Sequence, residues 1–216
     1  MCSGYYRYEH GYTPDFPGRD RYKGDFVHPQ LWPENLDYKD KQVVVIGSGA
    51  TAVTIVPEMA RTAAHVAMLQ RSPTYVVSRP SQDKIANRLR KILPRKTAYG
   101  LTRWKNVGLQ MLFFNRARTA PDKVRAMIKN LAQKELGPDY PVSTHFNPKY
   151  NPWDQRMCLI PDSDRFKELK SGRASVVTDT IDTFTETGIK LSSGQELKAD
   201  IVVSATGLDL QFLGGA

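Results

Sequence analysis

A run of small residues, Gly-Ser-Gly-Ala-Thr-Ala at positions 47–52, has the composition and spacing of a nucleotide-binding loop, G-x-G-x-x-A. Gly47 would permit a tight turn, Gly49 would let a pyrophosphate approach the backbone, and Ala52 would allow a helix to pack closely on a strand. A helix that begins here would also direct unpaired N–H groups at the phosphates. We therefore predict that a dinucleotide pyrophosphate is bound by Gly47, Ser48, Gly49, Ala50, Thr51 and Ala52.

The position that selects between NAD and NADP carries an arginine. The sequence Gln70-Arg71-Ser72 follows the next apolar segment, and Arg71 lies 24 residues after Gly47. Domains specific for NAD usually place Asp or Glu here to bind the ribose 2′-hydroxyl, whereas an arginine would pair with the 2′-phosphate of NADP. We predict that Arg71 and Ser72 bind NADPH. The alternative is that Arg71 is only a solvated residue at the end of a strand.

Two short apolar segments would position this loop. Residues 41–46 (K-Q-V-V-V-I) and 65–69 (H-V-A-M-L) predict strands on either side of a helix, so residues 41–80 form a βαβ unit. Pro57 falls inside the helix and predicts that it is bent or short. The loop depends only on the first turn of that helix. The pattern predicts an α/β fold with a Rossmann-like dinucleotide-binding domain.

The C-terminal part of the chain predicts further strands. Residues 173–207 alternate β-branched residues with turn signals, and end in the apolar run 201–203. This pattern is typical of a β-meander that returns to a buried strand. Residues 1–40 are rich in Tyr, Pro, Gly and Asp and predict an extended connector.

The middle of the chain has a different character. Residues 81–135 carry apolar residues at helical spacing, and Pro94, Gly100 and Pro121 would divide them into about three helices. Residues 137–162 contain several prolines and predict a loop.

Composition bounds the class of protein. The chain has 216 residues, is 40% hydrophobic and has a net charge of +9, which is ordinary globular composition apart from the charge. Its two cysteines, Cys2 and Cys158, suggest neither a disulfide framework nor a metal site, so we expect a reducing cytoplasm. Residues 84–129 hold thirteen Lys or Arg residues against the single acid Asp122, a local net charge of +12.

The basic segment 84–129 has three interpretations. Amphipathic basic helices bind anionic lipid, so peripheral membrane contact is one of them. Specific nucleic-acid binding is disfavoured because no nucleic-acid motif is present. We favour the third, in which a stripe of apolar residues faces a core and the basic residues form a solvated face. That stripe consists of Ile85, Leu89, Trp104, Leu112 and Phe113.

Two further motifs carry a resemblance to a known family. Residues 22–33 (Y-K-G-D-F-V-H-P-Q-L-W-P) resemble the Baeyer–Villiger monooxygenase fingerprint F-x-G-x-x-x-H-x-x-x-W-P; Gly24, His28 and Trp32 match, and Tyr replaces Phe. Residues 200–207 (D-I-V-V-S-A-T-G) resemble the A-T-G marker of flavoproteins with two dinucleotide-binding domains. This marker adds Thr206 and Gly207 to the predicted cofactor-binding residues. With the glycine loop between them, these motifs resemble flavin-dependent Baeyer–Villiger monooxygenases, especially the ethionamide-activating type.

The resemblance implies an FAD- and NADPH-dependent monooxygenase. In that family NADPH reduces FAD, and a C4a-peroxyflavin formed with O2 inserts one oxygen atom into ketones or oxidises sulfur or nitrogen atoms. A small-molecule ketone, sulfide or thioamide is therefore the implied substrate. A family arginine that stabilises the peroxide matches Arg156 in the motif N-P-W-D-Q-R, with a surface salt-bridge residue as the alternative. Many relatives carry Lys where this chain has Gln155, so we expect Arg71 to carry more of the 2′-phosphate contact.

The fingerprint residues His28 and Trp32 are expected to act in structure rather than in chemistry. A packed interdomain linker, with His28 as a hydrogen-bonding spacer, could couple NADPH binding to domain closure without touching the substrate.

The ends of the chain suggest an internal piece of a longer enzyme. Cys2-Ser3-Gly4 resembles the end of a strand from an FAD domain whose own glycine loop is not in this sequence, so we expect FAD to be held only in the intact enzyme and the piece alone to be inactive. A stand-alone NADP-binding module without catalysis is the alternative. The expected divisions are 1–40 (end of an FAD-domain strand and linker), 41–80 with 150–207 (NADP-binding domain), 81–149 (basic helical insertion) and 208–216 (start of the return to the FAD domain).

Overall fold

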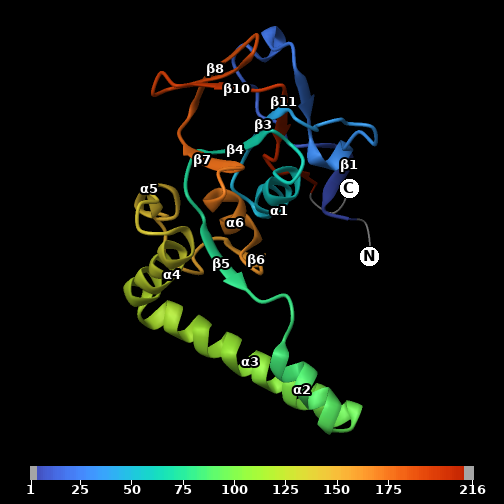
Figure 1. Ribbon diagram of the computed structural model, residues 1–216, viewed down its shortest axis with the longest axis vertical. Helices are drawn as coiled ribbons and strands as arrows, with labels where there is room; N and C mark the ends of the chain where they lie inside the picture. Colours follow the sequence, from blue (N-terminus) through green and yellow to red (C-terminus); the bar gives the residue numbers. More distant parts are fainter. Residues whose placement is uncertain (1–3, 212–216) are drawn as a thin grey trace. The chain divides into compact units, whose positions relative to one another are not determined.

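A five-stranded parallel sheet carries the glycine loop (Figure 1). The computed structural model describes residues 4–211. The chain divides into two compact units: residues 4–74 with 165–211, here called the sheet unit, and residues 75–164, here called the helical unit. The predicted strand end at Cys2 and Ser3 and most of the predicted segment 208–216 lie outside the described residues.

The parallel sheet is built from segments that are far apart in the sequence. Its neighbours pair in parallel register throughout. Strands buried on both faces need near-continuous apolar sequences, and Val43–Ile46 and Ile201–Val203 supply them. In sheet order the strands are β2 (Asp25–Val27), β11 (Ile201–Ser204), β3 (Gln42–Ile46), β4 (His65–Gln70) and β7 (Ala174–Thr178).

Helix α1 (Ala50–Met59) connects β3 to β4, as the βαβ prediction requires. The helix is short and ends two residues after Pro57, so the missing N–H of the proline affects only its last turns. A second helix, α6 (Asp164–Lys170), precedes β7. The predicted Rossmann-like α/β fold class is confirmed.

A three-stranded antiparallel meander covers one part of the sheet. It consists of β8 (Ile181–Thr185), β9 (Gly188–Leu191) and β10 (Glu196–Lys198). Phe184, Ile189 and Leu191 from the meander share one buried cluster with Val44 and Val202 of the parallel sheet. The meander therefore stabilises the sheet that carries the loop. In the sequence it lies between β7 and β11, and both of these strands belong to the five-stranded sheet.

The first 40 residues contain more regular structure than a connector. Strand β1 (Tyr6–Gly11) pairs antiparallel with β12 (Leu208–Leu210), and β2 lies at one end of the parallel sheet. Two single-turn 3₁₀ helices are also present, η1 (Arg19–Arg21) and η2 (Pro29–Leu31). These short strands pair with residues far along the chain, so local sequence patterns do not reveal them.

The helical unit contains α2 (Lys84–Ile92), α3 (Arg95–Thr119), α4 (Pro121–Leu136) and α5 (Val142–His145), with the parallel strand pair β5 (Tyr75–Arg79) and β6 (Met157–Pro161). Pro94 and Pro121 separate the helices as predicted. Gly100, however, lies inside α3 and does not interrupt it. Residues 137–162, predicted as loop, include α5 and β6, whose alternating Cys158 and Ile160 are buried.

The predicted core-facing stripe of the basic segment is wrong for three of its five residues. Ile85, Trp104 and Leu112 are exposed. Phe113 packs against the buried cluster of Tyr75, Ala117, Val124 and Ile128. Helical spacing identified an apolar face correctly, but burial of that face depends on what packs against it.

The two compact units do not have the expected domain boundaries. The sequence division placed residues 75–80 and 150–164 with the dinucleotide domain, whereas β5 and β6 belong to the helical unit. Both strands pair with each other and not with the five-stranded sheet.

Candidate functional site

The glycine loop turns sharply between β3 and α1. Gly47 has a φ of 133°, and its N–H donates to the carbonyl oxygen of Leu69 at 2.8 Å. A Cβ at this position would lie 2.4 Å from the carbonyl oxygen of Ala205. Both the backbone angle and the close approach to β11 therefore require glycine.

The end of the loop opens onto the first turn of α1. Gly49, the N-cap, has an extended backbone and no side chain with which to cap the helix. The following residues, Ala50 and Thr51, are exposed, while Ala52 is completely buried. The first-turn N–H groups lack intrahelical acceptors and, with the positive end of the helix dipole, form a suitable site for an anion.

The side chain of Ser48 points into the protein. It is buried, its hydroxyl donates to the carbonyl oxygen of Ser72 at 3.3 Å, and it accepts from the hydroxyl of Thr74 at 3.1 Å. Only the backbone of Ser48 is thus left to serve the predicted phosphate contact. The side chain instead ties the loop to the segment that follows β4. The sequence analysis did not identify Thr74. The one feature that could have indicated it is its hydroxyl side chain directly before an apolar strand.

Arg71 and Ser72 lie at the same edge of the sheet as the glycine loop. The strands β3 and β4 are parallel neighbours, so their carboxyl ends meet there. Gln70 is buried and its amide nitrogen donates to the hydroxyl of Thr178 at 2.8 Å, whereas Arg71 and Ser72 are exposed. The structure therefore brings the predicted pyrophosphate loop and the predicted 2′-phosphate residues together.

Thr206 and Gly207 follow β11 and contact the N-terminal segment. The Thr206 hydroxyl donates to the carbonyl oxygen of Tyr12 at 2.6 Å and lies 2.9 Å from the Ser204 hydroxyl. The carbonyl oxygen of Gly207 accepts from the N–H of Tyr12 at 3.1 Å. The A-T-G segment thus joins the residues after β1 to the carboxyl end of β11.

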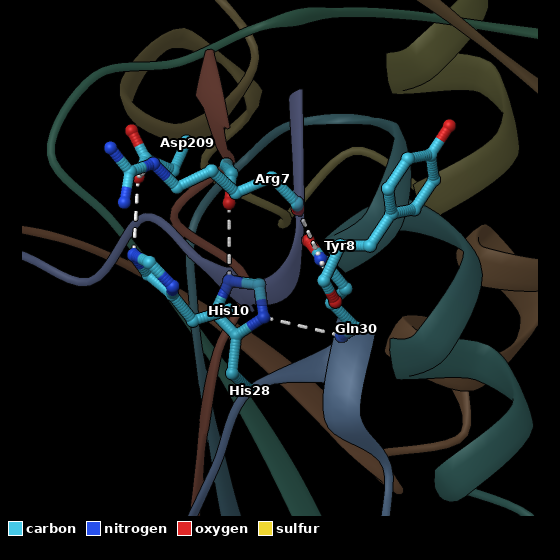
Figure 2. A network of polar contacts seen from close by, with 7 residues as sticks. Arg7, Tyr8, His10, His28, Gln30 and Asp209 are labelled. Atoms are coloured by element: carbon cyan, nitrogen blue, oxygen red, sulfur yellow. Dashed lines mark hydrogen bonds and ion pairs between the residues drawn. The ribbon is translucent and has the colours of Figure 1, made fainter. Parts of the chain in front are cut away.

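His28 makes a hydrogen bond with each ring nitrogen (Figure 2). Its Nδ1 accepts from the N–H of Gln30 at 3.2 Å, and its Nε2 lies 3.1 Å from the carbonyl oxygen of Gly207. A carbonyl can only accept, so the geometry requires the neutral tautomer with the proton on Nε2. A Cβ on Gly11 would lie 1.8 Å from the imidazole ring, so only glycine fits beneath it.

Gln30 extends this network to β1. Its side-chain nitrogen donates to the carbonyl oxygens of Arg7 at 2.6 Å and Tyr8 at 2.9 Å (Figure 2). On the paired strand β12, Asp209 Oδ2 lies 3.1 Å from both Arg7 Nε and His10 Nε2. Gln30 was not among the predicted residues, and nothing in the sequence distinguishes it from a surface glutamine.

The three fingerprint residues do not lie together. Gly24 precedes β2 at the amino edge of the sheet, where a Cβ would lie 2.4 Å from the carbonyl oxygen of Asp200. His28 follows β2 at the opposite, carboxyl edge, and half-buried Trp32 ends the 3₁₀ turn η2. The fingerprint therefore spans the sheet: Gly24 allows close packing at one end, and His28 joins chain segments at the other.

Arg156 belongs to the helical unit, directly before β6, and is exposed. Its carbonyl oxygen accepts from the hydroxyl of Tyr150 at 2.9 Å. In the same motif, Asp154 pairs with Arg118 at 2.5 Å. The Asn151 side chain accepts from Arg125 at 2.7 Å. Because the glycine loop lies in the other unit, the catalytic role of Arg156 stays a prediction.

The described residues hold no group of three or more His, Cys, Asp or Glu side chains that could bind a metal ion. None of the helices in residues 4–211 is both long and apolar enough to cross a membrane.

The known proteins that this chain resembles in sequence are described as flavin-dependent monooxygenases. Residues 1–107 match the family profile described as flavin-binding monooxygenase-like. The chain is 54% identical to the FAD-containing monooxygenase EthA of Mycobacterium tuberculosis (strain H37Rv), over 100% of the chain and 44% of that protein. It is 55% identical to the probable FAD-binding monooxygenase AlmA of Acinetobacter baylyi, over 99% of the chain and 43% of that protein. The chain thus spans less than half the length of these relatives.

Solved structures share the fold at lower identity. An oxidised steroid monooxygenase bound to NADP is similar with a TM-score of 0.69 and 21% identity, over 95% of this chain and 46% of the other. A cyclohexanone monooxygenase bound to ε-caprolactone is similar with a TM-score of 0.71 and 18% identity, over 98% of this chain and 48% of the other.

Proposed function

The chain belongs to the flavin-binding monooxygenase-like family, and we propose that it forms the NADPH-binding part of an FAD- and NADPH-dependent monooxygenase. The proposed reaction inserts one oxygen atom from O2 into a ketone or oxidises a sulfur or nitrogen atom of a small molecule. Thioamides are included in the proposed substrate class.

The observation that carries this proposal is the shared edge of β3 and β4. There, the loop at Gly47–Gly49 opens onto the helix α1, and Arg71 follows the neighbouring strand. This is the carboxyl edge of a parallel sheet, at which dinucleotides bind in Rossmann-like folds. The Ser48–Ser72 hydrogen bond holds the two binding segments together.

The residues present fit NADPH. An uncapped helix start suits a pyrophosphate, because its first turn reads Ala-Thr-Ala-Val and carries no acidic side chain that would repel the phosphates. Arg71 and Ser72 would hold the 2′-phosphate, with the arginine fork matching its oxygens. When bound, NADPH would supply the hydride that reduces the flavin.

His28, Gln30 and Thr206 would position the backbone segments near the cofactor and would take no part in the reaction. His28 and Gln30 join β1, the η2 turn and Gly207, so they fix the backbone at the carboxyl edge of β11, next to β3. Thr206 contributes through its bond to Tyr12. We propose that Trp32 has a packing role in the segment 22–33, which also contains His28.

Arg156 is proposed as the fixed cation that stabilises negative charge developing on oxygen during transfer. Its neighbouring segment is held by Asp154 and Asn151, which bind Arg118 and Arg125 respectively. A supported backbone would keep the guanidinium in place at small entropic cost. Gln155 offers no charge for the 2′-phosphate, which is why that contact is assigned to Arg71.

A second candidate function is a stand-alone NADP-binding module without catalysis. It is favoured by one observation, that the sequence contains a single G-x-G-x-x-[GA] pattern, at residues 47–52. One dinucleotide loop accounts for one dinucleotide.

Two measurements on the purified chain test these functions. Titration calorimetry should show NADPH binding more tightly than NADH, and equal or undetectable binding of both would contradict the NADPH assignment. A visible spectrum recorded after addition of FAD and desalting then tests the stand-alone module. Retained flavin that bleaches with NADPH would contradict a module without catalysis, whereas a colourless protein that binds NADPH is the result expected of the NADPH-binding part of a longer enzyme and is also the result expected of the module.

A further inference from the structure

One face of α3 exposes large apolar side chains. Leu101, Trp104, Met111 and Leu112 are 50%, 73%, 60% and 59% exposed. Residues 101, 104, 108 and 111 follow one another at intervals of three and four, so they lie on the same side of the helix. The apolar stripe therefore runs for several turns along a surface that no part of the described helical unit covers.

The same face carries no charge. The positions on this side are uncharged throughout, although the segment around them holds thirteen Lys or Arg residues. They are Thr97, Leu101, Trp104, Gly108, Met111, Leu112, Asn115 and Thr119. The basic side chains of α3 are thus confined to the rest of its circumference, which makes the helix amphipathic with an unburied apolar side.

Helix α2 adds exposed apolar residues to the unit. Ile85 and Ile92 are 55% and 79% exposed and lie two turns apart, which places them on one face of α2. The helix packs against α3 (Figure 1), and the Asp83 carboxylate pairs with Lys105 between them. Small buried residues, Ala86 and Ala98, allow the two helices to approach closely.

A groove of about 400 Å³ lies between α3 and α4 and continues the apolar stripe through Leu112. Its lining is apolar except for two cations. The lining includes Leu109, Leu112, Phe113 and Met127, and the two cations are Arg116 and Lys123. An apolar groove with cations is chemically suited to an acyl chain beneath an anionic headgroup.

We propose that α2 and α3 bind the surface of an anionic lipid bilayer. The apolar stripe would enter the boundary between headgroups and acyl chains, with Trp104 at the level of the headgroups, and the surrounding Lys and Arg residues would face lipid phosphates. The proposed contact is peripheral, with both helices lying on the bilayer surface.

Charge decides between a bilayer and a second copy of this chain. Residues 84–129 carry a net charge of +12. A self-complementary dimer through this face would bring two such segments together, which opposes association. An anionic surface instead complements the charge and accepts the apolar side chains as well.

Vesicle co-sedimentation tests the proposal with the full chain. We expect it to pellet with phosphatidylcholine vesicles that contain phosphatidylglycerol at low salt, and to be partly released by high salt. The double variant Leu101→Gln/Trp104→Gln should lower the bound fraction about tenfold, since two apolar anchors are lost. Leu159→Gln/Leu210→Gln is the matched control, because both leucines are exposed but lie outside α2 and α3.

Charge and insertion are tested separately. Lys91→Glu/Lys96→Glu should weaken binding to the anionic vesicles, and Lys190→Glu/Lys198→Glu, with the same charge change outside this segment, should not. Vesicles should shift the tryptophan emission of the unmodified chain to the blue, and Trp104→Phe should abolish that shift. Circular dichroism would establish that each variant is folded.

Three results would overturn the proposal. They are the absence of pelleting with anionic vesicles at low salt, an equal loss of binding in the stripe variant and its leucine control, and a concentration-dependent oligomer that Leu101→Gln/Trp104→Gln disperses without lipid.

Discussion

The two units use apolar residues in opposite ways. In the sheet unit, Val44, Ile46 and Val202 are buried between the parallel sheet and the meander. In the helical unit, Trp104, Met111 and Ile92 are more than half exposed. The sheet unit therefore buries these apolar residues in its own core, while α2 and α3 of the helical unit display apolar side chains on a surface that a partner could cover.

This difference shows what an amphipathic pattern can and cannot establish. Apolar residues at intervals of three and four define a face of a helix, but the same pattern arises from a core and from a lipid-facing surface. In α3, a small set of residues faces the protein, with Ala98, Phe113 and Ala117 toward neighbouring helices or strands. Phe114 contacts the ring of Trp153, and the exposed stripe of Leu101, Trp104 and Met111 is left for another contact.

The largest effect should come from the glycine that begins the loop. Gly47→Ala would place a Cβ 2.4 Å from the Ala205 carbonyl oxygen at a φ of 133°, and we expect a loss of about 3 kcal/mol in the free energy of unfolding. The control Gly194→Ala has a φ of 88° but no atom within 4 Å of its Cβ, so it should cost only about 1 kcal/mol. Urea denaturation measures both. Equal losses would show that backbone angle alone, and not packing on β11, fixes this turn.

The next effect concerns the cofactor rather than the fold. Arg71→Ala should lower the affinity for NADPH by about 10- to 100-fold, because a charge-assisted contact of about 1.5–3 kcal/mol is lost, and should leave the affinity for NADH unchanged. Arg61→Ala is the control, since that exposed arginine pairs with Glu58 on the surface after α1. Isothermal titration of both nucleotides measures the ratio. A parallel loss of NADH and NADPH affinity would argue against a 2′-phosphate contact.

The βαβ core and its glycine loop were predictable because their determinants are local. A run such as Val43–Ile46 can be satisfied only by burial on both faces of a sheet, and the glycine pattern fixes the turn that follows. By contrast, β2 and β12 are three residues each and pair with partners far away in sequence. Their formation depends on the tertiary fold, which local patterns do not contain.

The candidate site divides in the same way. The sequence predicts Gly47, Gly49 and Arg71 as dinucleotide-binding residues, and the structure places their segments at one edge of the sheet. The inward direction of Ser48 and the role of Gln30 could not be predicted, because each depends on carbonyl groups that only the folded chain brings near. Gly100 failed as a helix breaker since a glycine costs only about 1 kcal/mol in a long helix.

A smaller effect should follow from separating the loop from the segment after β4. Thr74→Val removes the hydroxyl that donates to Ser48, and we expect about 1 kcal/mol of destabilisation from the lost buried hydrogen bond. The selectivity for NADPH over NADH should also fall slightly, because one of the two hydrogen bonds that join the loop to the segment after β4 is lost while the Ser48–Ser72 bond remains. Thr54→Val, which removes an exposed hydroxyl from α1, is the control. If stability changed but selectivity did not, the contact would serve the fold alone.

The smallest effect tests the helical unit by pH. Asp83 accepts a side-chain hydrogen bond from Lys105 and backbone hydrogen bonds from Ala86 and Ile85, and these hold its pKa at about 2, below the ordinary value of 3.8. A carboxylate with a lowered pKa in the folded state stabilises that state above its ordinary pKa, and the contribution is lost as the pH falls through about 2.

Hydrogen exchange of the α2 amides in the unmodified chain and in Asp83→Ala would measure that contribution at each pH. We expect faster exchange in the variant at neutral pH, from loss of the N-cap and the ion pair, and convergence of the two proteins toward pH 2. Exchange in β3 and β4 should be the same in both, because the cap lies in the other unit. Asp182→Ala is the control, because Asp182 is an exposed residue of β8 in the other unit. Faster exchange in the parallel sheet of the Asp83 variant would mean that the two units unfold together, and that the contrast between them concerns surface chemistry rather than stability.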